Sequence, residues 1–324
     1  MQDKRLYLKI ACLIEIIYII SMSIYYLFFN KIDDSVIANI FFLIISLYIN
    51  WILYKESKKP IDELESNKRR VILASIWFFL NPVLPGIFGF IFLNSISDKK
   101  NIMLPKVNHE SKKKSMYIKS FVLLAAFVCI MFIFPRFRFF SKVPSYAIYI
   151  FIFILIIILN YKELAYDFKI YIKNIKVYIP FIIKRYLLML LITFLVAIPI
   201  VLINNGQTSA NQVLINSMFK KLPFWTFMLS VLYAPFAEEN VFRLSLSKFF
   251  NNKTLFIIIS GILFGSLHMI DKITSASDLL YIIQYSTLGI CLAKAYADSD
   301  NIFVSITIHF LQNFIAAIQV LIFY

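Results

Sequence analysis

The sequence has few charged residues and few cysteines, and both shortages exclude a class of protein. Only 16% of its 324 residues are charged, whereas 60% are hydrophobic and the mean hydropathy is +0.78. This composition excludes an ordinary soluble domain and indicates an integral membrane protein. Cys12, Cys129 and Cys291 fall in apolar runs without CxxC or metal-type spacing. They are typical of small buried side chains, and they predict neither a disulfide framework nor a cysteine metal site.

Acidic residues are also scarce, 18 against 33 basic ones, which gives a net charge of +15. In a soluble chain this excess would suggest nucleic-acid binding. Here the lysines concentrate between apolar runs, where anionic lipid headgroups and the polarity of membrane insertion account for them. We therefore expect membrane lipids, and no nucleic acid, as partners.

Long apolar runs dominate the rest of the chain and predict an all-α, polytopic transmembrane helical bundle. Each is about long enough to cross the roughly 30 Å hydrocarbon core of a bilayer. The first run lacks a small-residue cleavage site after it, so we expect a retained helix and no removed signal peptide. The runs are residues 8–29, 36–53, 71–93, 121–140, 146–160, 186–203, 223–246, 255–270, 279–295 and 302–322.

The run at 71–93 decides the predicted topology, because it is broken at Asn81-Pro82 and at Pro85-Gly86. If it spans, the two sides of the membrane receive 15 and 18 basic residues, which is no bias. If it is a re-entrant hairpin, the inner side collects 26 and the outer side 7. The positive-inside rule then favours about nine spanning helices and a cytoplasmic amino terminus. The bias toward Lys, Ile and Asn indicates a bacterial plasma membrane.

Two regions differ in their content of intramembrane charge, although no Gly- or Ser-rich linker separates them. Residues 1–180 hold no charged cluster within an apolar run and are predicted to be an accessory transmembrane region. Residues 185–324 hold every polar cluster described below and are predicted to be the functional core. Between them, residues 160–180 alternate Lys with Tyr, Ile and Phe. This pattern suits either an interfacial helix or a solvated basic loop.

Ionisable side chains stand in the middle of the apolar run at 223–246, in the sequence AEENVFR. Each ionised group inside a bilayer costs roughly 2.5 to 3.5 kcal/mol on insertion scales, so Glu238, Glu239 and Arg243 need a reason beyond packing. Arg243 is four residues after Glu239 and shares its helix face, whereas Glu238 is turned away by about 100°. The spacing predicts one glutamate paired with the arginine and one left for chemistry.

Two further clusters show the same four-residue spacing on later apolar runs. Residues four apart lie on one face of a helix, so each pair presents its side chains together. The short turn FFNNKT joins the runs that hold Glu238 and His268 at similar distances from it, which predicts similar depth in the membrane. His309 lies on a run that starts near Asn301, after another turn on the same inner side, so it is expected in the same half of the membrane. We therefore expect one pocket to contain all three clusters. The two later pairs are Phe264 with His268 and His309 with Asn313.

These motifs resemble those of the CPBP (Abi) family of intramembrane proteases, over roughly residues 185–324. The family includes the CAAX prenyl proteases of the Rce1 type and bacterial bacteriocin-processing or self-immunity proteins. The motifs that carry the resemblance are EENVFR, the FxxxH of Phe264 to His268 and the HxxxN of His309 to Asn313. Three such motifs in order, on separate apolar runs, are far more specific than any one of them.

Peptide hydrolysis needs an activated water, stabilisation of an oxyanion and protonation of the leaving amine. A low-dielectric pocket favours the neutral form of a glutamate and makes its carboxylate a better general base than in water. A neighbouring histidine can orient the same water, which suits Glu238 and His268. His309 and Asn313, one helical turn apart, can offer two donors to the oxyanion. The resemblance implies the same assignment. Glu239, Arg243 and Phe264 are then expected to support the pocket.

A zinc-dependent mechanism is the alternative, with Glu238, His268 and His309 as three protein ligands and water as the fourth. The sequence has no HExxH spacing, so a metal-free site without a cofactor is the favoured prediction. The family has been described in both ways.

The predicted function is hydrolysis of a peptide bond in a hydrophobic or lipid-modified, membrane-associated peptide. The alternatives are a non-catalytic scaffold or bacteriocin self-immunity protein with the same fold, and a transporter that uses the buried charges as a proton relay. No charge cluster in the first half matches the second, which argues against the internal repeat typical of transporters.

Overall fold

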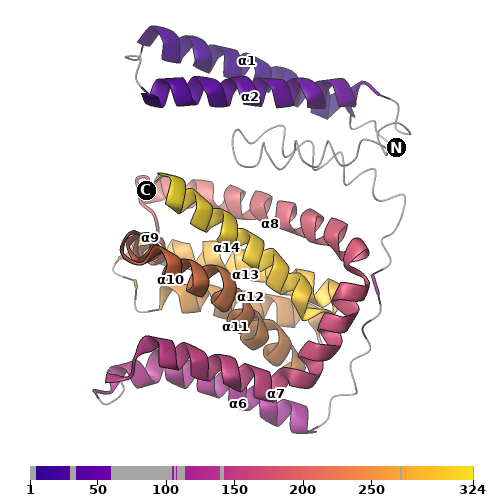
Figure 1. Ribbon diagram of the computed structural model, residues 1–324, viewed down its shortest axis with the longest axis vertical. Helices are drawn as coiled ribbons and strands as arrows, with labels where there is room; N and C mark the ends of the chain where they lie inside the picture. The colour runs from indigo at the N-terminus through magenta and orange to yellow at the C-terminus, as the bar shows by residue number, and fades with distance from the viewer. Residues whose placement is uncertain are drawn as a thin grey trace. The chain divides into compact units, whose positions relative to one another are not determined.

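The computed structural model describes most of the chain, in two compact units that are treated separately below (Figure 1). The units comprise residues 1–103 and 104–324. The predicted re-entrant hairpin at 71–93 lies outside the described residues. The boundary predicted between 180 and 185 concerns function and stays a prediction. The described residues are 5–29, 34–59, 104–105, 107, 114–138, 142–270, 272–273 and 275–323.

Every regular element in these ranges is a helix, so the predicted all-α class is confirmed. The first unit contributes α1 (Arg5–Phe29) and α2 (Asp34–Ser57), which pack on each other. The second unit opens with α6 (Lys114–Val128), the π-helical η1 (Cys129–Ile133) and the short 3-10 turn η2 (Phe134–Arg136). The other long helices of the second unit are α7 (Ser145–Lys173), α8 (Ile175–Ile203), α9 (Ala210–Lys221), α12 (Lys253–Met269), α13 (Leu279–Ser299) and α14 (Ile302–Phe323).

Five of the described helical segments are long and apolar enough to cross a membrane. A multi-pass membrane protein is thereby supported, whereas the count of nine spans and the orientation of the amino terminus stay predictions. The five segments are Lys114–Met131, Tyr146–Lys173, Ile175–Ile203, Ala276–Ser299 and Ile302–Leu321.

Residues 160–180 are helical on both sides of a single break at Asn174, so the solvated-loop alternative was wrong. Both the backbone N–H and the side-chain amide of Asn174 donate to the carbonyl of Ile170, at 3.1 and 2.9 Å. These bonds pair a carbonyl in the last turn of α7, at the point where the chain turns into α8. The break is short because one residue closes the first helix and precedes the second.

Asp167 explains why this part of α7 is tied to the functional core. Its Oδ2 accepts the backbone N–H of Ile302 at 2.9 Å, and its backbone carbonyl accepts the Asn301 amide at 2.8 Å. A side-chain acceptor at the first turn satisfies an N–H group that has no partner within the helix. Asp167, which is fully buried, therefore caps α14 from another helix and fixes where α14 begins.

Helices α12 and α13 approach so closely that glycines line their contact. A Cβ on Gly265 would lie 2.2 Å from the Ser286 hydroxyl oxygen, and one on Gly289 would lie 2.9 Å from the Cα of Gly261. Small residues allow such close packing of membrane helices, where van der Waals contact drives association. Figure 1 shows α12, α13, α14 and α8 side by side in the second unit. The close packing brings the end of α12 against α13.

The helix that carries the glutamate pair is irregular. It runs through α10 (Pro223–Phe227), the π-helical η4 (Met228–Tyr233), α11 (Ala234–Glu239), the π-helical η5 (Asn240–Ser245) and the 3-10 turn η6 (Leu246–Phe249). Pro235 lacks a backbone N–H, which removes one helical hydrogen bond next to η4. Single π turns inside α-helices are common at functional sites. Here two of them flank the segment APFAEE.

Candidate active site

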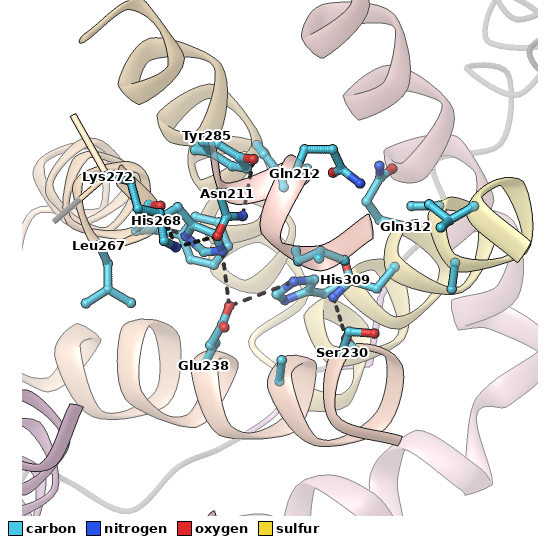
Figure 2. A pocket seen from close by; sticks show the side chains of 18 of the residues that line it. Asn211, Gln212, Ser230, Glu238, Leu267, His268, Lys272, Tyr285, His309 and Gln312 are labelled. Carbon is cyan, nitrogen blue, oxygen red and sulfur yellow. Dashed lines mark hydrogen bonds and ion pairs between the residues drawn. The ribbon is translucent and has the colours of Figure 1, made fainter. Parts of the chain in front are cut away.

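A cavity of about 460 Å³ lies between α9, α12, α13, α14 and the irregular helix (Figure 2). The predicted site residues on its wall come from three separate helices: Glu238 from α11, Phe264 and His268 from α12, and His309 and Asn313 from α14. The three motifs, separated by 26 to 75 residues in sequence, therefore meet in one pocket, as the depth argument predicts. Their catalytic roles remain a proposal.

Glu238 points into the cavity toward both histidines (Figure 2). Its Oε2 lies 4.0 Å from Nε2 of His268 and 3.9 Å from Nε2 of His309. Although this oxygen is buried, it makes no hydrogen bond to any other described residue. A buried polar atom without a partner is costly, and such atoms are characteristic of sites that bind water, an ion or a substrate.

His268 is held in one orientation by the helix that carries it. Its Nδ1 lies 2.8 Å from the carbonyl oxygen of Phe264, one turn earlier. Because a carbonyl only accepts, Nδ1 carries a proton, and Nε2 of the neutral ring is an acceptor directed toward Glu238. The Phe264 ring lies 4.4 Å from the imidazole, centroid to centroid, and Tyr285 stacks on it at 4.9 Å with an interplanar angle of 17°. The predicted pairing of Phe264 with His268 is confirmed.

Glu239 is fully buried beside the cavity and holds two partners. Its Oε2 lies 3.2 Å from Nε of Arg243, so the predicted pair is confirmed. Its Oε1 lies 2.9 Å from Nδ1 of His309. This second contact was not predicted from the sequence, because helical spacing relates residues within one helix and says nothing about partners on another. Because the Glu239 carboxylate bonds Nδ1 of His309, the imidazole is oriented with its other nitrogen, Nε2, facing Glu238.

Arg243 is also fully buried and joins three helices around the site. It donates from Nη2 to the carbonyl of Gly289 on α13 at 3.0 Å. Its guanidinium lies 4.7 Å from the centroid of the Phe264 ring on α12, within the range of a cation–π interaction. A buried ion pair compensates two desolvation penalties that would otherwise be several kcal/mol each. Arg243 therefore contacts the helices around the cavity without lining it, and its supporting role stays a prediction.

Asn313 lines the cavity but already uses one of its amide hydrogens. Its Nδ2 donates to the backbone carbonyl of Ser230 in η4 at 2.7 Å. The bond links α14 to the irregular helix and orients the amide. An amide nitrogen carries two hydrogens, so one remains for a ligand.

A second polar network closes the cavity on the side of α9, and none of its members was predicted from the sequence as a site residue. The Tyr285 hydroxyl lies 2.8 Å from the Ser209 hydroxyl and accepts from Asn211 at 3.3 Å. Lys272 donates to the Asn211 side chain at 2.5 Å and to the His268 carbonyl at 3.1 Å. These residues connect the start of α9 to His268 (Figure 2).

The described parts of the chain contain no preformed metal site. No group of three or more His, Cys, Asp and Glu side chains there is arranged to hold a metal ion.

Comparison with known proteins gives two matches and one negative result. Residues 220–315 match the family of type II CAAX prenyl endopeptidases described as Rce1-like. The UPF0177 protein YvdC of Lactococcus lactis subsp. lactis is 28% identical over 134 residues, which are 41% of this chain and 49% of that protein. The chain thus matches about half the length of this curated relative. No solved structure matches the chain.

The family match covers the segment in which Glu238, His268, His309 and Asn313 line one cavity. It confirms, over residues 220–315, the resemblance that the three motifs indicate.

Proposed function

We propose that the protein is an intramembrane endopeptidase that hydrolyses a peptide bond in a membrane-associated peptide, with water activated by Glu238 and His268. The observation that carries this proposal is the convergence of the unbonded Glu238 Oε2 with two histidine Nε2 atoms in a cavity between apolar helices. The Rce1-like match over the same residues supports a peptidase.

The spacing of these atoms suits a shared water. Two groups that each bond one water at about 2.8 Å lie roughly 4 to 4.6 Å apart. Glu238 Oε2 and His268 Nε2 are 4.0 Å apart, and both are acceptors when the glutamate is ionised and the ring is neutral. A water between them donates both hydrogens and keeps its lone pairs free. Its oxygen is then ready to attack a carbonyl carbon in the cavity.

The reaction follows from that arrangement. As the water oxygen bonds to the carbonyl carbon, Glu238 takes one of its protons and the carbonyl oxygen becomes an oxyanion. Collapse of the tetrahedral intermediate breaks the carbon–nitrogen bond, and the proton passes from Glu238 to the departing amine. Burial of the site strengthens each of these electrostatic interactions.

His309 and Asn313 are proposed to stabilise the oxyanion. Asn313 has one amide hydrogen free after its bond to Ser230, and a protonated His309 can donate from Nε2 while the Glu239 carboxylate balances its charge. One well-placed donor contributes about 2.7 to 4 kcal/mol to a barrier of this kind.

Zinc remains the second candidate for the same reaction, held by Glu238, His268 and His309. Both histidines direct Nδ1 at an oxygen and Nε2 at the cavity, which is the usual arrangement of zinc-binding histidines. Against it, tetrahedral ligands at about 2.0 to 2.1 Å lie roughly 3.3 to 3.4 Å apart, closer than the 3.9 and 4.0 Å found here. When bound, zinc would supply a Lewis acid for the water and the carbonyl. Metal analysis of the active, purified protein distinguishes the two.

The substrate is proposed to be a hydrophobic or lipid-modified peptide. Part of the cavity wall is apolar, formed by Ile215, Phe219, Ala317 and Val320, and this supports an apolar side chain beside the scissile bond. The Lactococcus relative and the composition support a bacterial plasma membrane.

The test compares membrane peptides in cells that express the wild type or Glu238→Ala at equal levels. We expect a peptide to accumulate uncleaved with Glu238→Ala, His268→Ala and His309→Ala, and to be cleaved with the wild type. Glu163→Gln, on α7 and outside the cavity, is the matched control and should cleave normally. Identical peptide profiles for the wild type and Glu238→Ala would sink the proposal and favour a non-catalytic scaffold or self-immunity protein.

A further inference from the structure

A second concavity, a groove of about 970 Å³, lies on a different face of the helix that carries Glu238. One wall is α7, which contributes Ile150 and Phe153. The other is formed by α10, η4 and α11, whose Leu229 and Leu232 line the groove, and the end of α9 completes it. The cavity described above uses other positions of the same helix, Ser230, Ala234 and Glu238. The groove is therefore separate from the proposed active site.

The groove is a wedge, because the helix that runs from α10 to α11 approaches α7 at its α11 end (Figure 1). Tyr149 meets Tyr233 at 5.1 Å between ring centroids, and Phe153 meets Phe236 at 5.3 Å. Further along, the Asn160 side chain donates to that of Asn240 at 3.1 Å. In these three pairs the residue numbers increase together on both walls, so the two walls run parallel. The bond between Asn160 and Asn240 joins them toward their carboxy-terminal ends. The groove accordingly opens at the amino-terminal ends of both walls.

The open end has the chemistry of a membrane interface. Tyr146 stands in the first turn of α7 and Trp225 in the first turn of α10, and their side chains are 64% and 60% exposed. Trp and Tyr concentrate at the level of lipid headgroups. Lys221, at the end of α9, is the one charged residue among the described residues that line the groove. A cation at the mouth of an apolar wedge complements an anion that carries a hydrocarbon chain.

We propose that this groove binds an anionic glycerophospholipid, with one acyl chain in the wedge and the headgroup phosphate at Lys221. The volume lies within the range of pockets that enclose small molecules. The apolar walls contribute the burial of hydrocarbon, about 0.8 kcal/mol for each buried CH₂ group. Lys221 discriminates in favour of negative headgroups. The proposal concerns lipid binding alone and holds whether or not the neighbouring cavity hydrolyses peptides.

The test is native mass spectrometry of the full-length protein, purified in mild detergent and supplied with phosphatidylglycerol or phosphatidylcholine. Leu232→Trp fills the groove from a half-exposed position, and Lys221→Gln removes its cation. We expect the wild type to retain one phosphatidylglycerol, Leu232→Trp to lose it, and Lys221→Gln to bind it about five-fold less while phosphatidylcholine binding is unchanged. Thermal unfolding of each variant confirms that it is folded.

Two matched controls sharpen the result. Leu255→Trp adds the same ring to an exposed leucine on α12, outside the groove, and Lys220→Gln removes the neighbouring cation, which does not line it. Both should retain the lipid like the wild type. Equal retention by Leu232→Trp and the wild type would overturn the proposal, because the lipid would then be bound at another place on the protein. Equal binding of the two lipids by the wild type would also overturn it. If Leu232→Trp does not fold, Met228→Trp replaces it at the same wall.

Discussion

Glu239 and His309, 70 residues apart in the chain, are joined by a bond of 2.9 Å between Oε1 and Nδ1. The same carboxylate lies 3.2 Å from Nε of Arg243 through its other oxygen. It thus balances a buried cation and orients an imidazole on another helix. The two glutamates therefore differ in position, because Glu238 faces the cavity while Glu239 bonds residues behind its wall.

Glu239→Gln is expected to reduce peptide cleavage about 10- to 100-fold, as loss of a carboxylate behind a functional histidine commonly does. The amide keeps the shape and can still accept the Nδ1 hydrogen, but it no longer balances positive charge on His309. Cleavage rates in membranes containing equal amounts of folded protein measure the effect. A rate like that of the wild type would show that Glu239 only neutralises Arg243.

Arg243→Met together with Glu239→Gln separates these two roles. Removal of one partner from a buried ion pair typically costs about 3 to 5 kcal/mol, whereas replacement of both by side chains of similar volume is often nearly neutral. We expect Glu239→Gln to unfold at lower temperature and the double variant to regain most of the lost stability. Cleavage should stay low in the double variant. Recovery of both stability and cleavage would contradict a role for Glu239 on His309.

Tyr285 is expected to position His268, since its ring stacks on the imidazole and its hydroxyl bonds the start of α9. Tyr285→Phe keeps the stack and loses the bonds to Ser209 and Asn211, whereas Tyr285→Leu loses both. The phenylalanine variant should therefore keep kcat near the wild-type value and alter KM, because only the connection to α9 changes. The leucine variant should lower kcat as well.

Rates at several substrate concentrations distinguish these effects. Equal kcat for Tyr285→Leu and the wild type would show that His268 keeps its orientation without the stack. Ser209→Ala removes the partner of the Tyr285 hydroxyl at the N-cap of α9, and we expect it to alter KM and leave kcat near the wild-type value.

The motifs, their helical spacing and the turn FFNNKT were sufficient to predict that Glu238, His268 and His309 share one cavity. These features depend on neighbours along one helix or on two helices joined by a short turn, which a sequence displays directly. The pairing of Glu239 with Arg243 and of Phe264 with His268 followed in the same way.

Contacts between distant helices could not be predicted. His309 on Glu239, Tyr285 on His268 and Lys272 on Asn211 depend on how helices rotate and approach each other. The two π-helical segments change that rotation locally, and the glycine contacts of α12 with α13 set the approach. The regular 3.6-residue period of an α-helix predicts neither the π-helical segments nor the glycine contacts. The basic segment at 160–180 was ambiguous for a related reason, since the partner that fixes it, the start of α14, lies more than 100 residues further along.

Asp167 is expected to control the position of His309 and Asn313 from outside the cavity, because it caps the helix that carries them. Asp167→Ala leaves the Ile302 N–H without its acceptor, and loss of a cap of this kind costs about 0.5 to 2 kcal/mol. Asp167→Asn keeps an acceptor oxygen and should lose little stability. Hydrogen exchange at the first turn of α14 measures the difference and should be faster in the alanine variant alone. Cleavage should fall in parallel with that exchange, and protection unchanged in Asp167→Ala would show that α14 is fixed by its packing and not by its cap.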